Sequence, residues 1–242
     1  MSGPGPLDGG DDDLVWYAAY GSNLWQARFL TYLTGGPVPL APSGRHQRGA
    51  RDATPPRSAS TITVPHRLFF ARASAGWGGG GVAMLDPEPD PREATRCRLW
   101  LVSIQQFADV FAQENGHPDP IGIDVDELRR HRHADLHPGW YGRALHLGQG
   151  PGGHPVLTLT CPAAEREPLR AAHPSYLAVV GLGLVEGWGL DEAAAARYLA
   201  ERDGNRGSVD PSVLHHQLVA ARATPAATPA AAPAAPDRPG DR

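Results

Sequence analysis

Hydrophobic positions divide the chain into short strand-like runs and a few helical stretches. Residues 14–20 form a continuous apolar run that ends at Gly21, a pattern typical of a buried strand. Further strand-like runs cover 68–71, 82–85, 95–103, 139–147 and 156–160. A period near 3.6 residues predicts helices over 24–33, 104–114, 125–132, 175–186 and 191–201. Because helices and strands do not alternate one for one, we predict an α+β fold with a largely antiparallel or mixed sheet.

The two ends of the chain differ from this patterned region in composition. Residues 1–13 and 223–242 contain few large apolar side chains and are rich in Gly, Pro, Asp or Ala. Such segments cannot bury enough apolar surface to offset the entropy of ordering, so we predict that both are disordered. The pattern therefore gives one domain over 14–202 and a C-terminal extension over 203–222.

Two unusual segments interrupt the pattern. The glycine-rich run 76–81 joins two predicted strands, which favours a tight hairpin turn, because a phosphate-binding loop would lead into a helix. The segment from Pro37 to His66 is rich in Pro, Gly and Arg. Loops of this length inside a domain are usually functional or disordered. Two interpretations remain: a solvated insertion, or an arginine-bearing lid over an anionic substrate.

A carboxylate stands on the apolar face of the helix predicted over 104–114. Phe107, Val110, Phe111 and Glu114 share that face because they are spaced at i, i+3, i+4 and i+7, whereas Asp109 lies on another side. Asn115 and Gly116 then end the helix. A carboxyl that ends a buried stripe is a candidate general acid/base. Glu114 could instead reach solvent from the last turn.

A short polar turn follows the first strand. Tyr20-Gly21-Ser22-Asn23-Leu24 places small residues between a buried strand and a helix, where Ser22 or Asn23 could cap the helix and Gly21 could adopt angles that other residues avoid. The amides of such a turn can bind an anion without a charged side chain. The same pattern also suits a simple strand-to-helix connection.

The residues Trp-Tyr-Ala-Ala-Tyr-Gly-Ser-Asn-Leu at 16–24 resemble the signature of the γ-glutamylcyclotransferase-like superfamily. Two further stretches follow in the family's order. Residues 113–116, Gln-Glu-Asn-Gly, resemble the place of the family's catalytic glutamate, and residues 174–177 are similar to its C-terminal Pro-Ser-x-x-Tyr-Leu region.

The resemblance implies a small mixed β-barrel with flanking helices and a pocket at one mouth. It implies that the α-amine of a γ-glutamyl group attacks its own γ-carbonyl and releases 5-oxoproline and an amine. Glu114 would carry the protons, and the substrate would bind at the turn formed by Tyr20, Gly21, Ser22, Asn23 and Leu24, with backbone amides holding its anionic groups. No cofactor or metal is implied. Family members act on different γ-glutamyl compounds, so the substrate stays open.

Charge and composition narrow the function further. All 22 basic residues are arginine, which excludes Schiff-base enzymes and lysine-dependent phosphate loops. The net charge of −4 argues against nucleic-acid binding, and no apolar run approaches the roughly 18 residues that a membrane span needs. We therefore expect a cytoplasmic protein that binds neither nucleic acid nor membrane. The resemblance implies a small-molecule, γ-glutamyl or amino-acid-like substrate. Enrichment in Ala, Gly, Pro and Arg is typical of a GC-rich, bacterial genome. A cation in the pocket must be an arginine, from Arg28 or the 45–57 group.

Other functions remain open at this stage. One is a non-catalytic module that binds a small ligand with the same fold. Another is a metal-dependent deacylase that uses His131, His133 and His137, of which the last two would share a helical face. Arg132 beside them argues against a bound cation. Tyr141 could line a pocket from its strand or serve only in packing, and Cys97 is expected to pack in the core.

Overall fold

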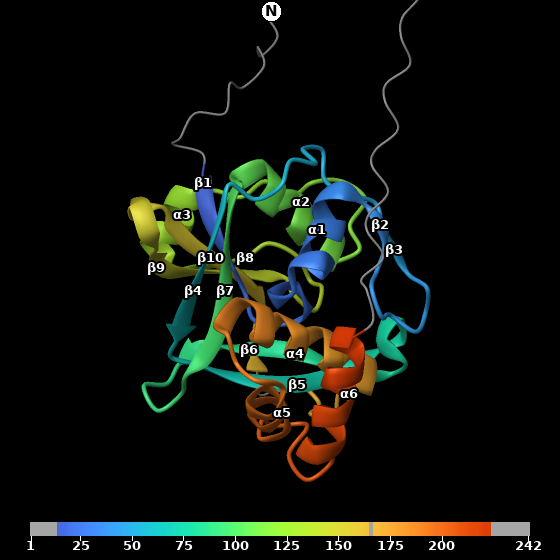
Figure 1. Ribbon diagram of the computed structural model, residues 1–242. Helices are drawn as coiled ribbons and strands as arrows, with labels where there is room; N and C mark the ends of the chain where they lie inside the picture. Colours follow the sequence, from blue (N-terminus) through green and yellow to red (C-terminus); the bar gives the residue numbers. More distant parts are fainter. Residues whose placement is uncertain (1–13, 165–166, 224–242) are drawn as a thin grey trace, which may run out of the picture.

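A six-stranded mixed sheet forms the centre of the computed structural model, which describes residues 14–164 and 167–223. Its strand order is β4-β7-β1-β10-β9-β8 (Figure 1). The central strand β1 (Leu14–Ala19) is antiparallel to β7 (Thr95–Ser103) and parallel to β10 (Pro155–Thr160). The outer strands are β4 (Ser58–Val64), β9 (Arg143–Gln149) and β8 (His133–Asp135). The predicted α+β class is confirmed, but the sheet has two edges, β4 and β8, and does not close into a barrel.

Both faces of the central strand are buried. Successive side chains point to opposite faces of a sheet, so Trp16 and Ala18 enter one apolar cluster while Val15 and Tyr17 enter the other. A strand covered on both sides needs apolar residues at every position. This explains why the run that begins at Leu14 shows no polar alternation.

A second sheet contains only β5 (His66–Ser74) and β6 (Gly80–Pro89), an antiparallel pair joined through the short 3₁₀ turn η3 (Ala75–Trp77). The hairpin predicted at the glycine run is therefore confirmed. The glycines also make room for a neighbouring segment. Gly81 N donates a hydrogen bond to Ala171 O (2.8 Å), and a Cβ at Gly81 would lie 2.1 Å from Arg170 O.

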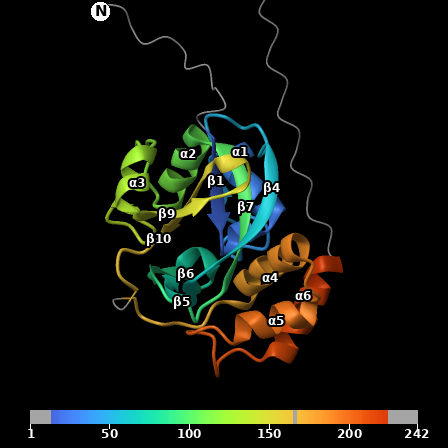
Figure 2. The ribbon, with the colours of Figure 1, turned by 90° about the vertical axis from the view of Figure 1, so that its left-hand side faces the viewer.

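The helices form two groups on opposite faces of the six-stranded sheet. The group on the Tyr17 face contains α1 (Gln26–Thr34), α2 (Ile104–Glu114) and α3 (Val125–His131). The group beside β5 and β6 contains α4 (Pro174–Trp188), α5 (Glu192–Ala200) and α6 (Pro211–Ala223) (Figure 2). Within the described part of the chain, none of these helices is long and apolar enough to cross a bilayer.

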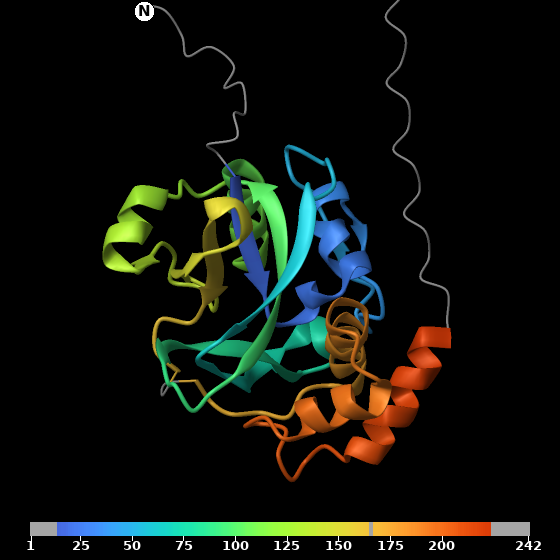
Figure 3. The ribbon, with the colours of Figure 1, turned by 60° about the vertical axis from the view of Figure 1, so that its left-hand side comes forward.

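The predicted C-terminal extension joins the core through α6. Leu214 and Leu218 are buried in the same cluster as α4 and α5, and Figure 3 shows α6 lying along them. A Cβ at Gly181 would lie 2.4 Å from Leu218 Cδ2, so the two helices approach closely there. The disordered ends predicted at 1–13 and 223–242 lie outside the described residues, apart from Ala223 at the end of α6.

The arginine-rich segment is structured, contrary to the expectation of a long loop. It contains a small hairpin of β2 (Gly36–Pro37) and β3 (His46–Gln47), and then β4, which pairs with β7 along its whole length. The alternation that identifies strands is weak in β4 because it lies at the sheet edge, where only Val64 is fully buried. Most of its side chains can therefore be small and polar.

Helix α4 presses directly on the turn that follows β1. That turn is the 3₁₀ segment η2 (Ser22–Leu24). At Gly183 an added Cβ would lie 2.4 Å from Leu24 Cβ and 2.5 Å from Trp25 N. Because Gly183 has no side chain, α4 packs directly against residues 22–25 and holds that part of the chain in place.

Replacing Gly183 with Ala should lower the free energy of unfolding by about 1–3 kcal/mol, the usual cost of overpacking. Alanine is the better helix former by roughly 1 kcal/mol, so a net loss would identify the collision with the turn as its cause. Urea unfolding measures the difference. Gly122→Ala is the matched control, because nothing lies within 4 Å of its Cβ position. Equal stability of Gly183→Ala and the wild type would contradict this packing.

Candidate active site

A cavity of about 460 Å³ opens where β1 ends. Its lining comes from β1, β10 and the turn after β1, from α1, α4 and the end of α2, and from the β2–β3 loop, the β5–β6 region and the loop before β9. The lining residues are Tyr17, Tyr20, Gly21, Ser22, Asn23, Arg28, Tyr32, Arg45, Ser74, Trp77, Val82, Ala83, Glu114, Asn115, Gly116, Gly139, Trp140, Tyr141, Leu159 and Tyr176. Five of the six predicted site residues are among them; Leu24 is not.

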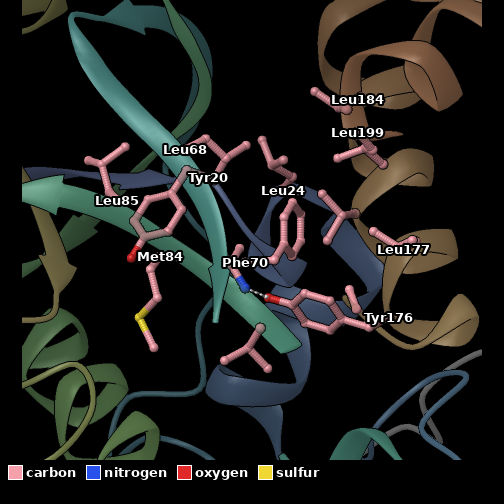
Figure 4. Close-up of a cluster of buried hydrophobic side chains, with 14 of the residues drawn as sticks. Tyr20, Leu24, Leu68, Phe70, Met84, Leu85, Tyr176, Leu177, Leu184 and Leu199 are labelled. Atoms are coloured by element: carbon pink, nitrogen blue, oxygen red, sulfur yellow. Dashed lines mark hydrogen bonds between the residues drawn. The ribbon is translucent and has the colours of Figure 1, made fainter. Parts of the chain in front are cut away.

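Leu24 belongs to the packing beneath the cavity. Its side chain is buried in the core cluster, among residues that include Tyr176 and Leu177 of α4 (Figure 4). Its Cβ is also the atom that an alanine at Gly183 would strike. The structure therefore places Leu24 where it anchors the turn, away from the surface that a substrate would touch.

The topology of β1, β7 and α2 brings Glu114 to the cavity. Strand β7 runs antiparallel to β1 and ends at Ser103 beside Leu14, at the start of β1. Helix α2 then begins, with a capping box between Ser103 and Gln106. Eleven residues of helix rise about 16 Å, close to the roughly 20 Å length of β1. The end of α2 thereby returns to the end of β1.

The predicted apolar face of α2 is confirmed. Phe107, Val110 and Phe111 are buried, and Glu114 follows them half-buried at the end of the helix. Asp109 lies on another side, as predicted, yet it is only 3% exposed. Its carboxylate accepts hydrogen bonds from the backbone N and the Nε of Arg51 (both 3.0 Å). One carboxylate of α2 is thus neutralised in a structural pair, while Glu114 faces the cavity.

Asn23 connects the turn after β1 to Glu114. Its Nδ2 donates to Glu114 Oε1 (2.9 Å) and to the hydroxyl of Tyr17 (3.0 Å). Its backbone carbonyl accepts from Trp100 Nε1 (2.9 Å). Both ends of this buried residue are therefore fixed, and the carboxylate of Glu114 is held against the turn.

Gly21 contributes to the site because it has no side chain, which leaves room for neighbouring residues of the cavity wall. Its φ is −111°, so the left-handed conformation that would require glycine does not occur, contrary to the expected use of unusual angles. A Cβ here would lie 3.0 Å from Tyr176 Oη and 3.2 Å from Ala83 Cβ. The hydroxyl of Tyr176 accepts a hydrogen bond from Ala83 N (3.1 Å; Figure 4), so a larger residue would disturb a contact in the cavity wall.

Asn115 ties a second loop to the end of α2. Its Nδ2 donates to Tyr141 O (3.2 Å), and its Oδ1 accepts from Tyr141 N (3.2 Å). The hydroxyl of Tyr141 donates to Ala83 O (2.8 Å). Tyr141 lines the cavity, from the loop before β9 and not from within the predicted strand.

Four tyrosines of the cavity lining, three of them buried and Tyr141 half-buried, are influenced by the charge of Glu114. Burial raises the pKa of Tyr17, Tyr32, Tyr141 and Tyr176, and the negative charge of Glu114 raises each further. For Tyr176 the pKa rises to about 12. The field of Glu114 therefore reaches all four phenols, and they stay protonated near neutral pH, where each keeps a hydroxyl able to donate or accept a hydrogen bond.

The cations of the cavity are arginines from the two places that the sequence indicated. Arg28 on α1 is 2% exposed; it donates to Thr31 Oγ1 (2.9 Å) and to the hydroxyl of Tyr32 (2.7 Å). Its guanidinium also lies 4.2 Å from the centre of the Tyr32 ring. The Nε of Arg28 is buried and has no partner among the described residues. Arg45 is exposed, on the loop between β2 and β3.

The histidines considered as metal ligands do not share a helical face. Helix α3 ends at His131, Arg132 has a φ of 68°, and His133 begins β8. His137 instead stacks edge-on against His117, with ring centres 5.6 Å apart. Over residues 14–164 and 167–223, no group of three or more His, Cys, Asp or Glu side chains could hold a metal ion.

The two cysteines are free and buried, as expected for Cys97, which was predicted to pack in the core. Burial raises the pKa of both thiols, that of Cys161 to about 11. Neither is placed to act as a thiolate nucleophile at neutral pH.

Proteins similar to this chain include one curated protein and two solved structures. No protein-family model matches the chain. "Histone deacetylase 5" of Arabidopsis thaliana is 35% identical over 207 residues, which cover 76% of this chain and 30% of that protein. The chain thus spans under a third of the length of this relative.

The two solved structures are more distant in sequence. One, titled "Gamma-glutamyl cyclotransferase", is 15% identical with a TM-score of 0.46 and covers 84% of this chain and 99% of that chain. The other, an uncharacterized protein from Homo sapiens, is 16% identical with a TM-score of 0.45 and covers 85% and 98%. Similarity at this level leaves the function to be inferred from the residues of the cavity.

Sequence analysis missed most of the aromatic lining. Tyr32 lies one helical turn beyond Arg28, and this Arg–Tyr pair at i and i+4 on α1 was a usable signal. Tyr176 lay within a recognised motif, but nothing in its spacing indicates that its hydroxyl crosses to β6. Trp77 lies inside the glycine-rich run 76–81. That run was interpreted as a hairpin turn from its glycines alone, so no role was assigned to Trp77.

Rising pH should destabilise the protein through these tyrosines. The pKa of Tyr176 is about 12 in the folded protein and near 10 when unfolded, so between these values the unfolded chain loses its proton first. The free energy of unfolding should then fall with pH, by up to about 1.4 kcal/mol per pH unit for each such group. Urea unfolding at pH 9 to 11.5 measures the slope. Tyr176→Phe should show a shallower slope than the wild type, and an unchanged slope would count against this assignment.

Proposed function

We propose that this protein is a γ-glutamylcyclotransferase-like enzyme. It cleaves a γ-glutamyl amide by intramolecular aminolysis and releases 5-oxoproline and an amine. The observation that carries this proposal is the placement of Glu114. Its carboxylate is held 2.9 Å from Asn23 Nδ2, inside a cavity that also contains the guanidinium of Arg28.

The cavity suits the amino-acid end of a γ-glutamyl group. A volume of about 460 Å³ is in the range of small-ligand sites. The α-carboxylate needs a cation or hydrogen-bond donors, which Arg28 and the amides of the Tyr20–Leu24 turn supply. The α-amine needs an acceptor, which Glu114 supplies. Apolar atoms of Val82, Ala83 and Trp77 cover the methylene groups between them.

The reaction needs one group that first accepts and then donates a proton. The α-ammonium group first loses one proton to solvent. Its nitrogen then attacks the γ-carbonyl carbon and forms the ring C–N bond, while Glu114 takes a second proton from that nitrogen. The carbonyl oxygen becomes an oxyanion, for which Tyr176 offers a hydroxyl proton that no described residue accepts. Glu114 then returns its proton to the leaving nitrogen, and the original C–N bond breaks. The carboxylate ends as it began, without a cofactor.

A non-catalytic ligand-binding module is the second candidate. The observation that favours it is the unpartnered Nε of buried Arg28, which suits tight binding whether or not a reaction follows. The name of the Arabidopsis relative raises deacetylation for the longer protein that contains a similar segment. A metal-dependent deacylase would need three ligands, and the part of this chain that the structure describes brings no such group together.

Glu114→Gln should abolish most turnover while the cavity keeps its shape. Wild-type protein, incubated with a panel of γ-glutamyl amines and peptides, should release 5-oxoproline. Loss of the acid/base should reduce kcat by about 10²- to 10⁴-fold on any substrate found. Chromatographic assay of 5-oxoproline measures it. Glu127→Gln, an exposed carboxylate on α3, is the matched control and should keep full activity.

Two outcomes would contradict the proposal. Wild-type turnover in Glu114→Gln would remove the acid/base from the mechanism. Calorimetric binding of γ-glutamyl compounds by the wild type without any 5-oxoproline would favour the binding module.

A further inference from the structure

The turn that carries Asn23 satisfies only half of its own carbonyl groups. Leu24 N donates to Gly21 O (3.0 Å). Trp25 N donates to Ser22 O (3.3 Å). The carbonyls of Asn23 and Leu24 instead accept hydrogen bonds from side chains outside the turn. Because buried carbonyls need partners, the second half of the turn depends on its neighbours for its geometry.

Both outside donors stand on β7, two positions apart. Trp100 Nε1 donates to Asn23 O (2.9 Å). Arg98 Nη1 donates to Leu24 O (3.2 Å). Alternate residues of a strand share one face, and the guanidinium carbon of Arg98 lies 4.0 Å from the centre of the Trp100 ring. The two donors therefore form one unit, in which Arg98 supports the indole while it holds the next carbonyl of the turn.

Arg98 is fixed from another side by α4. It is only 8% exposed, and its Nη1 also donates to Glu186 Oε1 (2.5 Å). An added Cβ at Gly187 would lie 3.0 Å from Arg98 Cδ, so the last turn of the helix packs on the stem of this side chain. Arg98 is not among the described residues that line the cavity. Any influence on a substrate must therefore pass through the groups that Arg98 holds.

The group between Arg98 and the candidate acid/base is the side chain of Asn23. The carbonyl that Arg98 holds belongs to the next residue, and Asn23 Nδ2 donates to Glu114 Oε1 (2.9 Å). A shift of the turn would move this amide and change the direction of the carboxylate. Misplacement of a reacting group by about 1 Å can cost roughly a hundredfold in rate. The position of the turn is thus a matter of chemistry as well as of stability.

We propose that Arg98 is a positioning residue for Glu114. It acts from outside the cavity. Its hydrogen bond to Leu24 O and its support of Trp100 fix the turn, and the turn fixes Asn23, which orients the carboxylate. This inference rests on the proposed function where turnover is measured, but the geometry that it predicts for the Asn23 amide does not depend on a reaction.

Arg98→Met tests the inference, because it keeps an apolar stem and removes the guanidinium. On any γ-glutamyl substrate that the wild type cleaves, kcat should fall about 10- to 100-fold, the order expected when a charged hydrogen bond that positions a catalytic group is lost. KM should stay within about twofold, because Arg98 does not line the cavity. Arg98→Lys keeps the charge opposite Glu186 and one donor group, so it should recover part of kcat.

Arg67→Met is the matched control. Arg67 also pairs with carboxylates, those of Asp86 and Asp203, and its guanidinium carbon lies 4.8 Å from the centre of the Phe69 ring. It does not belong to the described cavity lining. The control should lower the melting temperature and leave kcat unchanged. A merely structural role for Arg98 predicts the same result for Arg98→Met.

A double-mutant cycle shows whether Arg98 acts through Asn23. In a protein that already carries Asn23→Ala, the contact with Glu114 is gone, so adding Arg98→Met should change kcat by less than about twofold. Independent effects would instead multiply, and a full loss on top of Asn23→Ala overturns the proposal. If Arg98→Met does not fold, Arg98→Lys takes its place in the same cycle.

The two proposals fail in different ways. Wild-type kcat in Arg98→Met overturns the role of Arg98 and leaves the cyclotransferase proposal standing. If the wild type releases no 5-oxoproline, the proposed function fails, and nitrogen-15 NMR of the Asn23 side-chain amide decides the role of Arg98. The amide hydrogens, assigned by their loss in Asn23→Ala, should exchange with solvent at least about tenfold faster in Arg98→Met than in the wild type or Arg67→Met. Equal exchange in all three overturns the positioning role.

Discussion

The hydrogen bond between Asn23 and Glu114 joins two parts of the chain that lie 91 residues apart, and the candidate site depends on it. One partner stands where the central strand ends; the other stands where a helix of nearly the same length returns to that point. If α2 were one turn shorter, the carboxylate would stop about 5 Å before the cavity. The register of β7 on β1 and the capping box at Ser103 therefore have a chemical consequence, because they set where Glu114 arrives.

Close packing supplies the precision that this hydrogen bond needs. The turn carrying Asn23 lies between α4 on one side and Trp100 on the other, and two glycines make that possible. Gly183 allows α4 to touch the backbone of the turn, and Gly21 leaves room for the hydroxyl of Tyr176. A turn of three residues has little stability of its own. Its geometry is imposed by neighbours whose own positions come from the two apolar clusters on either face of the sheet.

The sequence predicted secondary structure correctly where the pattern within one segment was sufficient to define it. The run 14–20, the amphipathic face of α2 and the hairpin at 76–81 are local patterns, and each predicted its element correctly. The mixed α+β fold with flanking helices was predicted correctly, although its sheet is open; the structureless segment from Pro37 and the histidine face after α3 were wrong. Each depends on long-range pairing: β4 and β8 as open edges, β4 along β7, and β8 along β9. The tyrosines around Glu114 come from β1, α1, α4 and a loop, and no spacing along the chain brings those four together.

The absence of lysine takes on a structural meaning at Arg28. A buried guanidinium that keeps only two hydroxyl partners and the face of Tyr32 is less well solvated than it would be in water, so burying Arg28 costs some folding free energy. A lysine in that place could lose its proton and avoid the cost, whereas the guanidinium remains charged at any physiological pH. Under the proposed function, the group that pairs with this charge is the α-carboxylate of the substrate. Since a ligand that binds only the folded state adds its binding free energy to stability, binding of that carboxylate would offset the cost of burying Arg28.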